Sequence, residues 1–225
     1  MGIVLGGYVF DEGRVSVSER LEEVGGRDGR VIVMKGLTAR MASAAAVEAA
    51  LDAILAASSA REALSLREGR RMWVTRTDFT RAVAREQRVG SFTLTLRADT
   101  PWEEAATAST AAWAIHASAT TQALATAGNT WTSPSVALTA VGNLVCPGLS
   151  DGERSIVYAG TVPAGSVIVF DGTVGSITVD GVDVTAHGEG AFPRIAPTGT
   201  TVTYTDDGTG SHEATAEAAW RDRWW

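Results

Sequence analysis

Short apolar segments that end in an acidic residue followed by glycine recur through the last third of this chain. The clearest pairs are Asp171-Gly172, Asp180-Gly181 and Asp207-Gly208, and each follows alternating β-branched or aromatic residues. Glycine supplies the positive φ that a tight turn requires, so each pair predicts a hairpin between antiparallel strands. Strands repeated about every 8–12 residues favour a sandwich or a small barrel. We therefore expect the C-terminal part of the chain to be built of β-strands.

Residues 42–58 have the period of a helix. Apolar side chains at positions 47, 51, 54 and 55 fall on one face of about four turns, and Ser43 is placed to cap the N-terminus. A stripe of this kind most often covers a sheet, because one face of a sheet must be buried. We expect Glu48 and Asp52 to reach water at the edge of the stripe.

The remainder of the N-terminal part predicts strands and turns. Strands are expected at residues 15–18, 31–34, 64–67, 72–75, 79–85 and 91–97. In the last of these, Phe92, Leu94 and Leu96 alternate with polar residues, which places them on one face. Glu68-Gly69-Arg70 predicts a hairpin turn. The glycine-rich residues 24–30 lack the lysine and the following helix of a phosphate-binding loop, so they too predict a turn.

The charge differs between the two parts of the chain. Residues 1–98 carry 15 Lys and Arg against 12 Asp and Glu, whereas the remainder carries 4 against 14. Opposite bias favours two domains, with the boundary near Glu104. The net charge of −7 argues against binding of free nucleic acid, which needs clustered cations. No apolar run reaches the roughly 20 residues that span a bilayer, and no secretory signal is recognisable.

No convergent set of reactive groups is found, so we expect no enzyme, no cofactor and no metal. The three histidines lie far apart in the sequence and lack the spacing of zinc ligands. Residues 148–152 spell Gly-x-Ser-x-Gly, but Pro147 precedes them and a strand follows, which predicts a loop instead of a nucleophile elbow. Cys146 lacks the sequence neighbours of a catalytic thiol, and as a single cysteine it predicts no internal disulfide. Calcium is an unfavoured alternative at Asp180, Asp183, Asp206 and Asp207, because the spacing of an EF-hand is missing.

Seven tryptophans are an enrichment, and three of them, Trp220, Trp224 and Trp225, crowd the C-terminus. Two interpretations are open: filling of the core by a terminal strand that docks, or an exposed aromatic surface for sugar or a subunit. We favour docking for Trp220 and a subunit contact for Trp224 and Trp225.

The order and spacing of several short segments resemble the distal tail proteins of phages with long, non-contractile tails. These segments are Ala164-Gly165, Asp171, Val179-Asp180-Gly181-Val182-Asp183-Val184, Phe192-Pro193-Arg194, Pro197-Thr198-Gly199 and Thr203-Tyr204-Thr205. The N-terminal order of strands, alanine-rich helix, hairpin and closing Asp99-Thr100-Pro101-Trp102 is similar to the belt domain of the same proteins. Together the two resemblances cover most of the chain.

The resemblance implies a mainly β protein of two domains. Residues 1–104 would form a split β-barrel, or belt, domain with one α-helix, and residues 105–225 a galectin-like β-sandwich. The belt domains would close a homo-hexameric ring that joins the tail tube protein to the tail hub protein. The lumen of that ring would pass DNA without specific binding. The sandwich would provide a docking platform for receptor-binding components. The protein would reside in the virion tail, assembled in the host cytoplasm, with no membrane as partner.

Within that arrangement, four cations are hypothesised to lie at the subunit interface or the lumen, and interface ion pairs are favoured: Arg76, Arg81, Arg85 and Arg88. The rival function is a carbohydrate-binding β-sandwich adhesin, which predicts exposed aromatic residues gathered on one sheet face.

Overall fold

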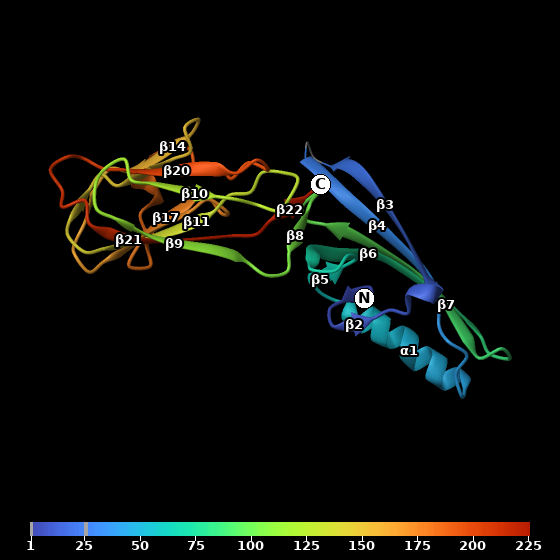
Figure 1. Ribbon diagram of the computed structural model, residues 1–225. Coiled ribbons are helices and arrows are strands. Elements are labelled where there is room, and N and C mark those ends of the chain that lie inside the picture. Colours follow the sequence, from blue (N-terminus) through green and yellow to red (C-terminus); the bar gives the residue numbers. More distant parts are fainter. Residues whose placement is uncertain (1, 25–26) are drawn as a thin grey trace. The chain divides into compact units, whose positions relative to one another are not determined.

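The protein is described by a computed structural model that covers residues 2–24 and 27–225 (Figure 1). The chain divides into two compact units. The N-terminal unit comprises Met1–Ala106 together with Trp225, and the C-terminal unit comprises Thr107–Trp224. Each is treated by itself below. Gly25 and Gly26 of the predicted glycine-rich turn lie outside the described residues.

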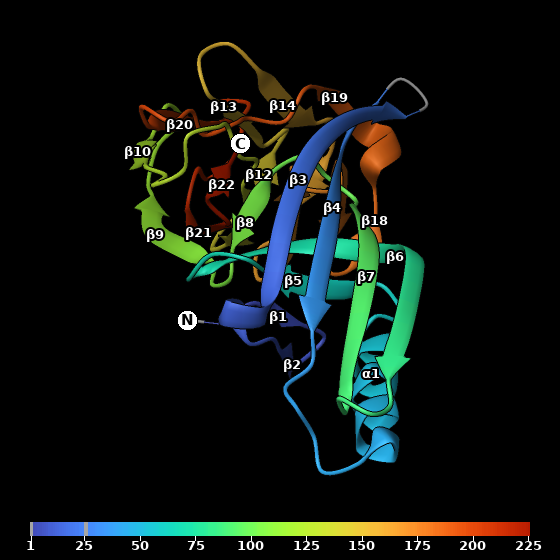
Figure 2. The same ribbon diagram turned by 90° about the vertical axis from the view of Figure 1, so that its right-hand side faces the viewer.

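The N-terminal unit is a strongly bent antiparallel sheet with one helix. Its elements are β1 Val4–Leu5, β2 Tyr8–Val9, η1 Glu12–Arg14, β3 Val15–Val24, β4 Arg27–Leu37, α1 Ala44–Ala57, β5 Glu62–Ser65, β6 Arg70–Ala84, β7 Val89–Ala98 and β8 Glu103–Ala105. The strand order is β2-β1-β5-β6-β7-β4-β3, and β8 pairs with β6. Figure 2 shows the long strands β3, β4, β7 and β6 side by side.

Helix α1 is built as its sequence pattern predicts. The Ser43 hydroxyl accepts a hydrogen bond from the Ala46 N–H at 3.2 Å and so caps the first turn. The apolar stripe, with Val47 and Leu51 fully buried, packs on β6 and β7. Gly90 on β7 lets the helix approach, because a Cβ there would lie 2.8 Å from Val47 Cγ1.

Two predictions for the strands of this unit have clear outcomes. In β7 the side chains of Phe92, Leu94 and Leu96 are buried on one face, as the alternation predicts. The prediction of separate strands at residues 72–75 and 79–85 is wrong, because β6 runs unbroken from Arg70 to Ala84. A β-bulge between Arg76 and Asp78 absorbs the extra residue that interrupts the sequence pattern.

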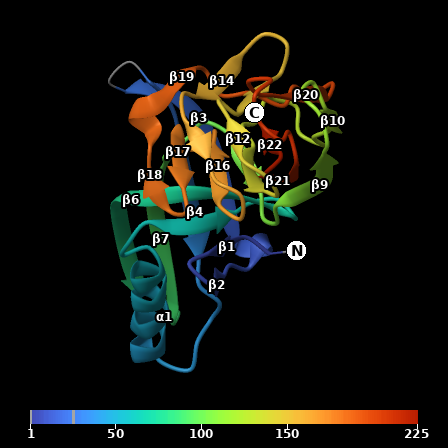
Figure 3. The same cartoon turned by 90° about the vertical axis from the view of Figure 1, so that its left-hand side faces the viewer.

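The C-terminal unit is a β-sandwich. Its elements are β9 Ser109–Ile115, β10 Thr121–Leu124, β11 Ser135–Ala140, β12 Leu144–Val145, β13 Gly148–Ser150, β14 Ser155–Tyr158, β15 Thr161–Val162, β16 Val167–Asp171, β17 Ser176–Val179, β18 Val182–Asp183, η2 Thr185–His187, β19 Gly188–Gly190, β20 Thr200–Thr205, β21 Ala214–Trp220 and β22 Arg223–Trp224. One sheet has the order β10-β20-β13-β14-β19 and the other β18-β17-β16-β11-β21-β9 (Figure 3). Leu138 and Phe170 of one sheet share a buried core with Tyr204 of the other.

The three acidic-glycine pairs have three different outcomes. Asp180 and Gly181 both have positive φ, +49° and +80°, and form the predicted tight turn between β17 and β18. The hairpin after Asp171 exists, but its positive φ lies at Gly175, because the turn spans residues 172–175. The hairpin predicted at Asp207-Gly208 is wrong, since β20 and β21 belong to different sheets.

The fold class predicted from the sequence, mainly β with one α-helix, is confirmed within the described residues. The loop predicted at residues 148–152 is wrong in part, because Gly148–Ser150 is strand β13; no helix follows it, as a nucleophile elbow requires. Across residues 2–24 and 27–225, the structure contains no helix long and apolar enough to cross a bilayer.

Candidate functional site

The sheet formed by β3, β4, β7 and β6 has two chemically different faces. On the face toward α1, one row across the four strands consists of Val17, Met34, Leu94 and Phe79, which pack in the core. The opposite face carries short hydroxyl side chains: Ser16, Ser18, Thr75, Thr80, Ser91, Thr93 and Thr95. We call this second face the hydroxyl face.

The hydroxyl face is nearly neutral. Among the residues whose side chains the structure describes, the charged ones on this face are three cations and two carboxylates, Arg20, Lys35 and Arg97 with Glu22 and Asp78. Ser16 and Ser18 use their hydroxyls to bond the β4 carbonyls of Lys35 and Val33, so part of the hydroxyl set is internally satisfied. A surface without clustered cations binds nucleic acid phosphates weakly. This face therefore lacks the clustered cations that tight phosphate binding requires.

The same four strands end in two open edges. Strand β3 spans 10 residues and pairs only with β4 among the described strands. From Thr75 to Ala84, β6 pairs only with β7 in the described part of the chain. Neighbouring strands run antiparallel throughout, so β3 and β6 run in opposite directions. An open edge with unpaired N–H and C=O groups is a template for a strand of another chain.

All four arginines hypothesised for the interface contact helix α1 or the segment that enters it. Arg81 pairs with Asp52, and Arg85 lies 3.6 Å from Glu48. The Arg76 guanidinium donates to the Leu55 carbonyl at 3.0 Å, and that of Arg88 to the Ala42 carbonyl at 3.1 Å. Glu48 and Asp52 reach water, as expected, with side chains 49% and 61% exposed, and they are also partners of the β6–β7 hairpin.

These contacts locate the arginines on the side of the sheet opposite the hydroxyl face. In the strand register Arg81 lies beside the buried Phe92, and Arg76 beside the buried Leu96. The four side chains therefore hold α1 against its own hairpin. Their participation in an interface between subunits stays a prediction.

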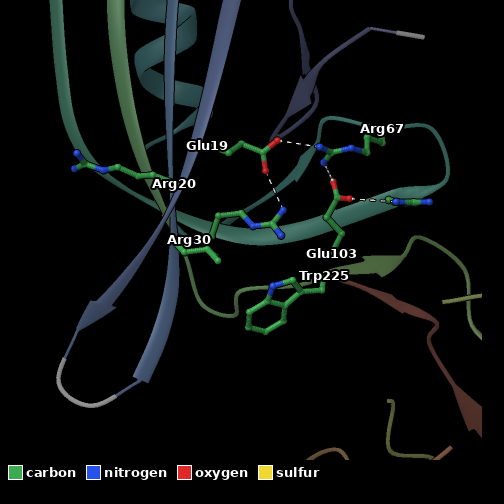
Figure 4. A pocket seen from close by; sticks show the side chains of 8 residues that line it. Glu19, Arg20, Arg30, Arg67, Glu103 and Trp225 are labelled. Atoms are coloured by element: carbon green, nitrogen blue, oxygen red, sulfur yellow. Dashed lines mark hydrogen bonds and ion pairs between the residues drawn. The ribbon is translucent and has the colours of Figure 1, made fainter. Parts of the chain in front are cut away.

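A cluster of ion pairs lies at the other end of the N-terminal unit, around a hollow of about 340 Å³ (Figure 4). Glu19 of β3 bonds Arg30 at 2.9 Å and Arg67 at 3.1 Å. Glu103 of β8 bonds Arg67 at 2.8 Å and lies 3.6 Å from Arg70. The hydrogen bond with Glu103 raises the pKa of Arg67 above its ordinary value, although burial opposes the shift.

This cluster joins three elements that are distant in the sequence. Arg67 lies in the turn between β5 and β6, and it bridges the edge strand β3 to β8. The Glu103 side chain is only 3% exposed, so its two arginine partners compensate a buried charge. The indole of Trp225 lies beside Arg30 and Glu103 in the same view. The cluster holds these elements together, because each of its carboxylates already bonds arginine. No sequence spacing indicated it.

The terminal tryptophans have different environments. Trp220 on β21 is 7% exposed and belongs to the sandwich core, where docking was expected. Trp224 is half-buried and Trp225 is 53% exposed. A role of Trp224 or Trp225 in a subunit contact stays a prediction. Among the described residues of the C-terminal unit, Trp131 is the one exposed tryptophan, whereas the adhesin hypothesis predicts several exposed aromatic residues on one sheet face.

Two of the carboxylates considered as calcium ligands, Asp183 and Asp206, hydrogen-bond nearby groups of the chain. Asp206 is buried and accepts a hydrogen bond from the Tyr204 hydroxyl at 2.9 Å, while His212 Nδ1 lies 2.6 Å from the same oxygen. Burial, and then the bond to Asp206, raises the pKa of Tyr204 far above its ordinary value. Asp183 accepts from the Thr185 N–H at 2.9 Å and caps a turn. Within the described part of the chain, His, Cys, Asp and Glu form no group of three or more that suits a metal ion.

Comparison with known proteins identifies the fold. No family model matches the sequence, and no curated protein is significantly similar to it. Among solved structures, the chain is similar to the Dit protein (gp 19.1) of phage SPP1, with a TM-score of 0.72 and 8% sequence identity. The match covers 100% of this chain and 99% of that protein, which its crystal structure presents as a paradigm of the hub adsorption apparatus in phages that infect Gram-positive bacteria. The fold implied by the resemblance to distal tail proteins is thereby confirmed over the full chain.

Proposed function

We propose that this protein is a structural component of a phage tail tip. The observation that carries the proposal is the likeness of fold, over the whole chain, to a protein of a phage adsorption apparatus. The contacts of the buried and half-buried carboxylates agree with it, because Glu19, Glu103 and Asp206 hydrogen-bond other side chains of the chain. The protein acts by assembly and makes or breaks no bond.

In the proposed assembly, N-terminal units form a homo-hexameric ring. The open edge of β3 in one copy pairs with the open edge of β6 in the next copy, where the antiparallel pattern of the sheet continues. The two edges differ, so the contact is head-to-tail, and such contacts close into a ring when the rotation fits. The open edges of β3 and of the second half of β6 are then both paired around the ring, which prevents open-ended association through these two edges.

The hydroxyl face lines the lumen in this assembly. DNA leaving a capsid must slide past the wall without being held, and a nearly neutral surface of Ser and Thr residues meets that need. The four arginines on the helix side then face away from the lumen. The ring joins the tail tube protein to the hub protein within the virion tail, and the C-terminal sandwich is the platform for receptor-binding components.

The test is the mass of the purified full chain, measured by native mass spectrometry together with electron microscopy of the particles. We expect six copies in a ring with a central channel. Val83 of β6 lies opposite Gly90, whose carbonyl accepts from Thr38 on the other side of β7, so the Val83 N–H points to the open edge. Replacing Val83 by proline removes this donor and is expected to leave lower oligomers. Circular dichroism checks that each variant keeps the β fold. A well-folded native chain that stays monomeric at high concentration would contradict the proposed ring.

The role of the arginines is tested separately by exchange of charges. Arg81→Glu is expected to weaken the ring if Arg81 bonds a neighbouring copy, and also if it only holds α1 in place. The double variant Arg81→Glu with Asp52→Arg restores the pair within one chain. Recovery of the ring in the double variant assigns Arg81 to its own helix, whereas continued loss assigns it to the interface.

A further inference from the structure

A second hollow, of about 560 Å³, lies entirely within the C-terminal unit and is not explained by ring assembly. Its lining comes from three segments of the sandwich: Trp131, then Asp151, Glu153 and Arg154, then Arg194, Ala196, Pro197, Gly199, Thr200 and Thr201. The volume falls in the range of sites for small molecules.

Arg194 forms one wall of the hollow. Its guanidinium lies over the Trp131 ring, with Cζ 3.7 Å from the ring centroid, and Arg223 Cζ lies 5.8 Å from the same centroid. Stacking of this kind holds a guanidinium plane in one orientation while its N–H groups stay free to donate. The indole therefore presents Arg194 as a rigid donor fork.

The carboxylate nearest to Arg194 is already used by the backbone. Asp151 Oδ1 accepts from the N–H groups of Glu153 at 2.9 Å and Arg154 at 2.7 Å, and Oδ2 accepts from the Arg194 N–H at 2.8 Å. Burial opposes ionisation of Asp151, but these hydrogen bonds outweigh it and lower its pKa below the ordinary value. Asp151 thus shapes the loop and brings Arg154 and Arg194 together.

The two guanidiniums lack carboxylate partners of their own. Across residues 2–24 and 27–225, no carboxylate oxygen lies within 4.0 Å of a side-chain nitrogen of Arg154 or Arg194. Burial, followed by the nearby positive charge of Arg154, lowers the pKa of Arg194. An anion placed between these side chains would relieve their mutual repulsion. This differs from the ion-pair cluster of the N-terminal unit, where every carboxylate bonds arginine.

We propose that this hollow binds a sugar residue that carries a carboxylate or phosphate group, with Arg154 and Arg194 on the charged group. Arginine forks match the geometry of such oxyanions, and two of them leave the remaining volume for a polyhydroxylated ring. Glu153 and Thr201, both exposed and both lining the hollow, are available to hydrogen-bond the hydroxyl groups of the ring.

The volume and the lining of the hollow favour a charged sugar over a lone oxyanion, an acidic peptide or a neutral sugar. A lone oxyanion would fill only a small part of about 560 Å³. An acidic peptide would bring several carboxylates toward Glu153 at the rim, and like charges repel. A neutral sugar would leave both guanidiniums uncompensated, and the Trp131 face on which it would stack is occupied by Arg194. The proposal does not depend on ring formation.

The test is binding of defined probes to the full chain. Isothermal titration calorimetry measures the affinity, and changes in amide chemical shifts locate the probe. The probes are glucuronic acid, glucose 6-phosphate, glucose and inorganic phosphate. We expect the two charged sugars to bind about tenfold or more tightly than glucose, because charge-assisted hydrogen bonds are lost with the neutral sugar. Inorganic phosphate is expected to bind more weakly than glucose 6-phosphate, since it lacks the ring.

Two variants locate the site. Arg154→Gln is expected to weaken the charged sugars about tenfold, and Arg97→Gln on the N-terminal unit, which removes the same charge elsewhere, is expected to leave them unchanged. If Arg154→Gln does not fold, shifts of the amides of Arg154, Arg194 and Thr201 in the native chain locate the probe instead. The proposal is overturned if no charged sugar binds, if glucose or phosphate binds equally well, or if the shifts or the Arg154 variant place binding elsewhere.

Discussion

Removal of the Glu103 carboxylate should weaken the N-terminal unit more than removal of any exposed carboxylate. The Glu103 side chain is 3% exposed, while its partners Arg67 and Arg70 are 48% and 32% exposed. Breaking a buried ion pair costs about 3–5 kcal/mol, and an exposed pair contributes about 0–1 kcal/mol. With a buried acid and half-exposed bases, we expect Glu103→Ala to cost about 2 kcal/mol of unfolding free energy, between these limits.

Differential scanning calorimetry measures this loss. In a chain of this length about 2 kcal/mol corresponds to a fall in Tm of at least about 4 °C. Glu103→Gln keeps the shape and one acceptor, so its Tm is expected to lie between those of the native chain and Glu103→Ala. The matched control is Glu22→Ala, which removes the partner of Arg20 from an exposed pair 2.7 Å long and is expected to shift the Tm by about 1–2 °C.

The Tm values of Glu103→Ala and Glu22→Ala together show whether the Glu103 ion pairs stabilise the N-terminal unit. A Tm loss for Glu103→Ala no larger than that for Glu22→Ala would mean that Arg67 and Arg70 gain as much from water as from Glu103. The ion-pair cluster would then contribute no stability to the N-terminal unit.

Four further changes test other parts of the structure. Gly90→Ala would push a methyl against Val47 on α1, and urea unfolding should show a loss of about 1–3 kcal/mol. Gly181→Ala forces a side chain into φ +80° and should cost about 1 kcal/mol in the same assay. The pKa of Asp151 is lower in the native state than its value of 3.8 in the unfolded chain, so the ionised carboxylate stabilises the native state at pH values above 3.8. This stabilisation is lost as the pH falls through the pKa of the native state. Asp151→Asn should therefore lose less unfolding free energy than the native chain between about pH 5 and pH 3. Because the pKa of Tyr204 is raised, its phenol should ionise only when alkali unfolds the chain, and absorbance titration of Tyr204→Phe should lack that late step.

The local elements were predictable from the sequence because the information for them is local. The cap at Ser43, the stripe of α1 and the turn at Asp180-Gly181 each depend on residues a few positions apart. Strand β7 was predictable for the same reason, since alternation along one strand decides which face is buried. The resemblance of ordered short segments to distal tail proteins then gave the fold that the structural comparison confirms.

Errors arose wherever pairing between distant segments decides the outcome. Strand β6 continues through its bulge because β7 offers a partner along Val74 to Ala84, although its own sequence is interrupted. Asp207-Gly208 joins two sheets, because β20 finds its partners in β10 and β13. Neither choice is encoded in the residues of the turn or the bulge alone.

By itself the sequence determined the class of the fold, helix α1 and the turn at Asp180-Gly181, since these follow from periodicity and from the conformations that glycine permits. Only the tertiary structure decided which charges meet. Glu19, Arg67 and Glu103 come from three separate parts of the chain, and the arginines of the β6–β7 hairpin meet α1 on the face of the sheet that the helix covers. Ion pairs between distant segments form after the backbone has fixed their positions, and linear spacing carries no record of them.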